Sequence, residues 1–192
     1  YRMQNMEITK DNYQLYMEYP DILDINGNSI LIFACKNKMN DVALKLIETG
    51  NSKPETINSK SDTALIWACK NEMDKVALKL IETGNSKPEF IRYDGGTAFI
   101  CACMFKMNEV ALKLIETGKS QPETIDEYNK TALIWVCKNK MTEVALKLIE
   151  TGKSKPETID EDDNTALIYA CKNKMTEVAL KLIETGKSKP ET

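Results

Sequence analysis

A nine-residue segment, Val-Ala-Leu-Lys-Leu-Ile-Glu-Thr-Gly, occurs five times in this chain of 192 residues. Its copies begin at Val42, Val76, Val110, Val144 and Val178, so the period is 34 residues throughout. A period of roughly 20 to 50 residues is the signature of a repeat architecture, in which one small unit stacks on copies of itself. Function then comes from the surface that the stack presents, and the residues that differ between copies are the informative ones.

Each copy contains two stretches that are typical of short helices. In the second copy the hydroxyl of Thr63 is a helix cap before residues 64–70, and Asn71 then supplies a residue that tolerates left-handed backbone geometry. The stretch from Met73 has apolar residues at i, i+3, i+4 and i+7 and ends at Gly84. Helices this short are marginal alone, so the sequence predicts an all-α fold of helix-turn-helix units that stabilise one another.

The segment between copies is predicted to be compact. Its Ser-Lys-Pro-Glu sequence predicts a single helical turn. We expect the isoleucine that follows to be buried under the stack, and the polar turn after it to place one residue at a positive φ angle. The isoleucines are Ile57, Ile91, Ile125 and Ile159, and the turn residues are Gly27, Ser61, Gly95, Asn129 and Asp163.

The period also predicts the domain organisation. Residues 20–24 match residues 54–58 one period later, which makes residues 1–24 a degenerate N-terminal capping repeat. Five repeats follow, at about 25–58, 59–92, 93–126, 127–160 and 161–192. The last repeat has no polar cap, which predicts either continuation of the array or end-to-end self-association through this uncapped C-terminal repeat.

Composition narrows the function classes. The net charge of −3 is spread over every copy and disfavours nucleic acid, and no apolar run approaches the roughly 20 residues that span a membrane. The chain has six cysteines and no histidine. Five cysteines recur at one repeat position, and stacked helices are about 8–10 Å apart, whereas a disulfide needs Cα atoms within about 7 Å. Free thiols predict a reducing, cytoplasmic location, and we expect no metal and no other cofactor.

The repeat resembles the ankyrin repeat over residues 20–192. Thr-Ala-Leu-Ile-x-Ala-Cys is similar to the family's T-P-L-H-x-A-A, and Glu-Val-Ala-Leu-Lys-Leu-Ile-Glu-Thr-Gly to its E-V-V-K-L-L-L-E-x-G. The resemblance implies an ankyrin-repeat solenoid that binds other proteins. The chain departs from the family in three ways: alanine replaces the proline, isoleucine replaces the histidine, and lysine or glutamate replaces the glycine between the helices in most copies. Without the histidine's hydrogen bonds, cohesion between copies should depend more on apolar packing.

One position on the first helix is aromatic in four of the five copies, and the resemblance places it on the concave groove where partners bind. Aromatic anchors of this kind commonly dominate binding energy, although the alternative is that the rings pack on the next copy. The turns add exposed tyrosines, and the third copy is an outlier with Phe105 where others have asparagine, through either repacking or a binding patch. The predicted partner-binding residues are Phe33, Trp67, Cys101, Trp135, Tyr169, Tyr93, Tyr128 and Phe105.

Lysines recur near the ends of the first helices, at Lys36, Lys70, Lys138 and Lys172. Cations there are favoured by the helix dipole, so these lysines indicate either a solvated face or a weak site for an acidic partner.

The chain lacks the convergent groups that catalysis needs. It has no histidine, no G-x-S-x-G motif and no phosphate-binding glycine loop. We therefore predict a non-catalytic protein-interaction scaffold that binds through the groove and the turns between repeats. The alternative is the substrate-recruiting part of a larger enzyme or of a ubiquitin-ligase adaptor whose other domains are absent from this chain.

Overall fold

The computed structural model describes residues 6–50 and 52–186, and within these ranges it contains eleven α-helices and no strand. An isolated antiparallel bridge joins Ile125 and Thr131. No helix in the described ranges is long and apolar enough to cross a membrane. The helices are α1 (Tyr13–Glu18), α2 (Ile30–Lys36), α3 (Asn40–Glu48), α4 (Ala64–Lys70), α5 (Asp74–Glu82), α6 (Ala98–Met104), α7 (Asn108–Glu116), α8 (Ala132–Lys138), α9 (Thr142–Glu150), α10 (Ala166–Lys172) and α11 (Thr176–Glu184). The predicted all-α fold is confirmed.

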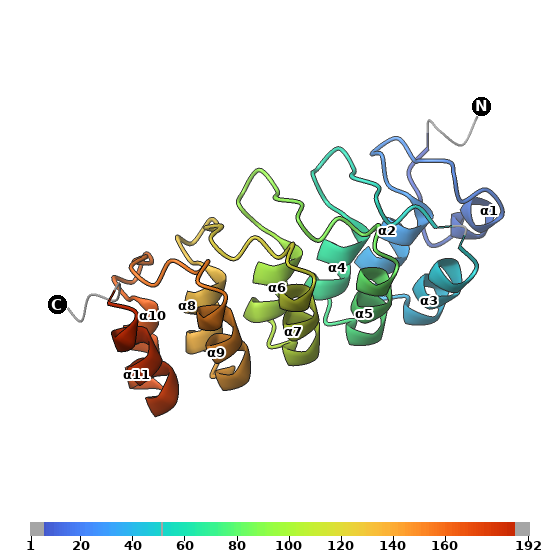
Figure 1. Cartoon of the computed structure of the whole chain (residues 1–192). Coiled ribbons are helices and arrows are strands. Elements are labelled where there is room, and N and C mark those ends of the chain that lie inside the picture. Colours follow the sequence, from blue (N-terminus) through green and yellow to red (C-terminus); the bar gives the residue numbers. More distant parts are fainter. Residues whose placement is uncertain (1–5, 51, 187–192) are drawn as a thin grey trace. The chain divides into compact units, whose positions relative to one another are not determined.

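From α2 onward the helices form pairs, each with a seven-residue first helix and a nine-residue second helix, here called the inner and outer helices (Figure 1). The chain divides into two compact units, residues 1–88 and residues 89–192. In the first unit α2 packs on α4 and α3 packs on α5, while α1 contacts α2. In the second unit α6, α8 and α10 pack in sequence, as do α7, α9 and α11. Each pair lies within one predicted repeat window, and the window boundaries stay a prediction.

Side-chain caps fix where the inner helices begin. The hydroxyl of Thr63 accepts a hydrogen bond from the backbone N–H of Ile66 at 3.2 Å, and Ser29, Thr97, Thr131 and Thr165 do the same in the other copies. These hydroxyls satisfy one of the N–H groups that a helix leaves unpaired at its start. The predicted capping role is confirmed.

The turn between the two helices differs from the prediction in one detail. Asn71 has a φ angle of −103°, so the expectation that this asparagine takes the left-handed conformation was wrong. The next residue takes it instead, with a φ angle of 56° at Glu72 and between 56° and 60° at Lys38, Lys106, Lys140 and Lys174. Left-handed geometry costs about 1–2 kcal/mol for a residue with a side chain, so each copy with lysine or glutamate carries this strain.

The asparagine instead joins neighbouring copies. The side-chain amide of Asn71 donates to the backbone carbonyls of Cys35 and Lys36, at 2.8 and 3.1 Å. Asn139 and Asn173 make the equivalent pairs of hydrogen bonds one repeat back. These bonds satisfy carbonyls at the end of the preceding inner helix, so cohesion is less exclusively apolar than the missing histidine led us to expect. Phe105 has no amide with which to make them.

The segment between repeats corrects two further expectations. At Ser-Lys-Pro-Glu the backbone forms one hydrogen-bonded turn, from Thr56 N–H to Lys53 carbonyl at 3.1 Å, and no helix. The following isoleucines are not buried: Ile91, Ile125 and Ile159 are 45%, 40% and 54% exposed. Side chains alternate in direction along extended backbone, and the neighbouring residue takes the inward position. It is a buried polar residue at Asn58, Asp126 and Asp160.

The predicted positive-φ positions of the polar turns are confirmed at Gly27, Ser61, Gly95, Asn129 and Asp163. Gly95 is the most constrained of these. A Cβ atom there would lie 1.9 Å from the carbonyl oxygen of Ile125, so this copy needs glycine for space as well as for its φ angle of 76°.

Candidate functional site

The inner-helix position predicted to bind a partner lies four residues after each capping hydroxyl, so the cap fixes its orientation. The structure places the five residues in different environments. Phe33 is 7% exposed, and its ring stacks on that of Tyr13 at 6.3 Å between centroids. Cys101 is 4% exposed and carries no ring. These two residues therefore offer a partner little surface.

Trp135 keeps a partly exposed ring that is held on several sides. Its indole N–H donates to Oδ2 of Asp126 at 2.7 Å. The ring of Tyr128 meets it edge-on at 6.4 Å between centroids, and the ammonium groups of Lys130 and Lys138 lie 5.8 and 5.5 Å from its centroid. These contacts position the indole rigidly at the surface, which lowers the entropy lost when a partner binds.

Tyr169 occupies the same position one repeat later and is 9% exposed. Its hydroxyl donates to Oδ2 of Asp160 at 2.9 Å, which matches the bond between Trp135 and Asp126. Burial, reinforced by the hydrogen bond and the charge of Asp160, raises the pKa of Tyr169 to about 12. The tyrosine therefore stays neutral at physiological pH.

Trp67, in the first unit, is also partly exposed and has Lys36 and Lys70 at 5.8 and 5.6 Å from its ring centroid. Here Asn58 stands at the position of Asp126 and Asp160, and its Oδ1 accepts from the backbone N–H groups of Lys60 and Asp62. The buried indole N–H of Trp67 has no acceptor among the described residues.

The remaining predicted residues lie in the turns of the second unit. Tyr93 is 81% exposed and has the guanidinium of Arg92 at 5.7 Å from its ring centroid, and Tyr128 is 44% exposed. Phe105 is partly exposed at the C-terminal cap of α6. The structure thus brings Tyr128, Trp135 and Tyr169 into one cluster with their lysines.

The centre of this cluster, Lys130, was missed by sequence reasoning. It is 4% exposed, and its ammonium lies 3.1 Å from Asp160 and 3.6 Å from Asp162 in the next turn. Burial by itself would raise the pKa of Asp160. Hydrogen bonds to the carboxylate outweigh the effect of burial and lower the pKa of Asp160. Their donors are the Asn164 backbone, Lys130, Tyr169 and the Asp162 backbone. No sequence signal separates Lys130 from a solvated turn lysine, because its partners are set by the stacking of two repeats.

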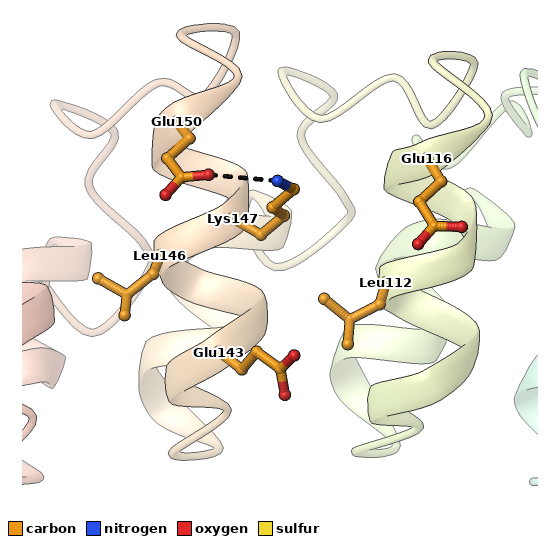
Figure 2. A pocket seen from close by; sticks show the side chains of 6 residues that line it. All are labelled: Leu112, Glu116, Glu143, Leu146, Lys147 and Glu150. Carbon is orange, nitrogen blue, oxygen red and sulfur yellow. Dashed lines mark hydrogen bonds and ion pairs between the residues drawn. The ribbon is translucent and has the colours of Figure 1, made fainter.

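A groove that sequence reasoning also missed lies on the outer helices (Figure 2). Leu112 of α7 and Leu146 of α9 line a groove of about 340 Å³, together with Glu116, Glu143 and the Lys147–Glu150 ion pair. A similar groove of about 290 Å³ in the first unit is lined by Leu44, Lys75, Leu78, Lys79 and Glu82. No metal-binding group of histidine, cysteine, aspartate or glutamate side chains occurs among the described residues.

The helix pairs, their caps and the stacked inner helices define a protein of the helical-repeat class. A family model described as ankyrin repeats (three copies) matches residues 5–91, 31–126 and 99–192. The chain belongs to the ankyrin-repeat family. A search of curated proteins found no match. Ankyrin repeats generally mediate protein–protein interaction, and the family is typically non-catalytic.

Proposed function

We propose that this chain is a non-catalytic scaffold that binds a partner protein through the inner-helix surface and the adjoining turns. The observation that carries the proposal is the partly exposed tryptophan held at the same inner-helix position in each unit, Trp67 and Trp135. Rigid, partly exposed tryptophans are the side chains that most often dominate binding energy at interfaces. None of the six cysteines forms a disulfide among the described residues, which agrees with action in the reducing cytoplasm.

The proposal is tested by a pull-down from a lysate of the source cells, with recovered proteins quantified by mass spectrometry. The parent chain is compared with a Trp67→Ala/Trp135→Ala variant and with a matched Leu78→Ala/Leu146→Ala variant altered on the outer helices. We expect the tryptophan variant to lose at least about 90% of the recovered partner, because the roughly 2 kcal/mol typical of a hot spot weakens binding by more than tenfold. Equal recovery by the parent and by a folded tryptophan variant contradicts the proposal.

The alternative is that this array recruits substrates for a larger enzyme or a ubiquitin-ligase adaptor. In that case the captured proteins become modified when the full gene product is expressed, and they stay unmodified with residues 1–192 alone. This experiment uses the same tryptophan variant, because both functions depend on the same surface.

End-to-end self-association is a further proposal for the last repeat. Leu180 and Ile183 of α11 are each 57% exposed, whereas Ile149, one repeat before Ile183, is 6% exposed. Exposed apolar patches of this kind favour association. Sedimentation velocity tests it: an Ile183→Glu variant should sediment as a monomer at a concentration where the parent does not, and a parent that is monomeric at about 100 μM contradicts it.

A further inference from the structure

Lysines on the inner and outer helices differ in their partners. Those of the outer helices, Lys79, Lys113, Lys147 and Lys181, each pair with a glutamate three residues later, at 3.1 to 3.4 Å. Those that end the inner helices, Lys36, Lys70, Lys138 and Lys172, form no ion pair with a carboxylate of the described residues. All but Lys70 are exposed. The inner helices α2, α4, α8 and α10 therefore end in a lysine without a carboxylate partner, and Lys172 donates to Oδ1 of Asn164 at 2.7 Å.

In the second unit these cations alternate with the aromatic rings. Lys138 lies 5.5 Å from the ring centroids of both Trp135 and Tyr169, and Lys172 lies 5.9 Å from that of Tyr169. We call these four residues the lysine–aromatic strip. Ring faces are electron-rich and attract cations, whereas ring edges are electron-poor. Tyr169 is only 9% exposed, so the strip offers a visiting group the exposed ammonium groups of Lys138 and Lys172 and the partly exposed indole of Trp135. The two ammonium groups favour an anion.

Two further exposed lysines extend this charge at a cost to the fold. Lys140 and Lys174 follow two residues after Lys138 and Lys172, with φ angles of 60° and 57°. Glycine would take this conformation without strain. In the second unit the side chain kept at this position adds positive charge beside the strip, whereas Glu72 has the same backbone conformation in the first unit.

We infer that the lysine–aromatic strip binds an acidic, proline-containing segment of the partner in polyproline II conformation. This inference rests on the proposed function. Neighbouring inner helices lie about 8–10 Å apart. A polyproline II segment rises about 3.1 Å per residue with three residues per turn, so residues i and i+3 lie on one side about 9 Å apart. Glutamates at that spacing meet Lys138 and Lys172, and a proline between them packs on the partly exposed ring of Trp135.

The charges in the turns fix where this segment lies. The exposed carboxylates of Glu161 and Asp162 precede α10, whereas Lys172 ends it. An acidic segment is repelled from the turns and attracted to the lysine ends of the inner helices. The first unit repeats the arrangement with Lys36, Trp67 and Lys70.

The probe is a fluorescein-labelled peptide with three Glu-Pro-Pro repeats, and its binding to the 192-residue chain is measured by fluorescence anisotropy. A peptide of the same composition with its three glutamates adjacent tests the spacing, a Lys-Pro-Pro peptide tests the sign, and oligo-dT tests general polyanion binding. We expect the Glu-Pro-Pro peptide to bind at least about fivefold more tightly than the other three, and to weaken as salt rises.

Charge reversal locates the site. A Lys138→Glu/Lys172→Glu variant should weaken the Glu-Pro-Pro peptide about tenfold or more, whereas a Lys147→Glu/Lys181→Glu variant, with the same net charge but altered on the outer helices, should change it less than about twofold. Circular dichroism checks that both charge-reversal variants are folded. If the Lys138→Glu/Lys172→Glu variant is unfolded, a Lys138→Ala/Lys172→Ala variant replaces it.

Four results overturn the inference: equal weakening in the two variants, equal or tighter binding of the clustered peptide, tighter binding of oligo-dT, or no binding of the Glu-Pro-Pro peptide below about 1 mM. If one of these four results is found while the tryptophan variant still loses its partner in the pull-down, only the inference of an acidic segment is wrong and the proposed function stands. If that variant keeps its partner, the proposed function fails as well.

Discussion

Replacing Lys130 by methionine should destabilise the second unit substantially. The Asp160 side chain is 0% exposed and the Lys130 side chain 5% exposed, with 3.1 Å between their charged atoms. Removing one partner of a buried ion pair typically costs about 3–5 kcal/mol, because the other charge stays buried and uncompensated. Asp160 keeps three other donors, which are the backbone N–H groups of Asp162 and Asn164 and the hydroxyl of Tyr169. Because these donors still compensate the carboxylate, we expect a smaller loss in the free energy of unfolding, about 2–3 kcal/mol.

Methionine is the appropriate substitute because it keeps an apolar stem of similar length against Tyr128 and Trp135. The assay is urea unfolding followed by tryptophan fluorescence in a Trp67→Phe background, in which Trp135 is the one remaining tryptophan. The signal then reports the unit that contains Lys130. A matched Lys147→Met variant removes an exposed lysine that is paired with Glu150, and should lose less than about 0.5 kcal/mol.

A double-mutant cycle with Asp160→Asn isolates the pair. We expect a coupling energy of about 2 kcal/mol at pH 7. The pKa of Asp160 is lowered in the folded protein, so its contribution is present above the unfolded pKa of about 3.9 and is lost as pH falls through the lower folded value. The coupling should vanish over that acidic range. If Lys130→Met costs no more than Lys147→Met, the buried pair does not stabilise the fold and the reasoning is refuted.

Three further predictions concern single positions. Asn139→Ala removes two hydrogen bonds of 2.9 Å to the preceding repeat, and should lower the free energy of unfolding in urea by about 1–2 kcal/mol. The control is Asn37→Ala, which loses a hydrogen bond within its own copy and should cost less. Equal losses in the two variants contradict the inter-repeat role of Asn139. Glu72→Gly relieves a φ angle of 56° and should stabilise by about 0.5 kcal/mol, visible as a higher melting temperature, whereas a lower one argues against strain. The pKa of Tyr169 is raised to about 12, so the stabilisation of the fold by neutral Tyr169 is complete below the unfolded pKa of about 10 and is lost as pH rises to 12. Tyr169→Phe should therefore flatten the dependence of the free energy of unfolding on pH between about 10 and about 12. An unchanged slope in that range contradicts this prediction.

Repetition and local chemistry were sufficient for much of the fold. The 34-residue period, the capping threonines such as Thr63 and the apolar stripe after Met73 predicted helix pairs, because caps and helical periodicity act over a few residues. The turn positions with positive φ followed from the same local reasoning. Local reasoning placed the positive φ angle of the helix–helix turn at the asparagine, which was wrong. Both the asparagine and the residue after it are compatible with a turn, and only the closure of the helix pair decides which of them takes the left-handed conformation.

Other features depend on how the copies pack. The sequence predicts buried side chains for the isoleucines at 91, 125 and 159, because they are apolar residues in a polar segment. In the folded repeats they are exposed, and a neighbouring polar residue is buried at Asn58, Asp126 and Asp160. Phe33 and Tyr169 share a repeat position with Trp67 and Trp135, but contacts with Tyr13 and Asp160 bury them.

The sequence by itself determined that this is an ankyrin-type array of helix pairs, because the period and the helix signals are local properties that recur in every copy. Tertiary structure alone decided which aromatic rings stay exposed, that Lys130 is buried between two turns, and that asparagines join neighbouring repeats. The physical reason is that burial and hydrogen bonding between copies depend on atoms 30 or more residues apart in the chain, as in the bond from Asn58 to Asn28, and spacing within one repeat does not specify those contacts.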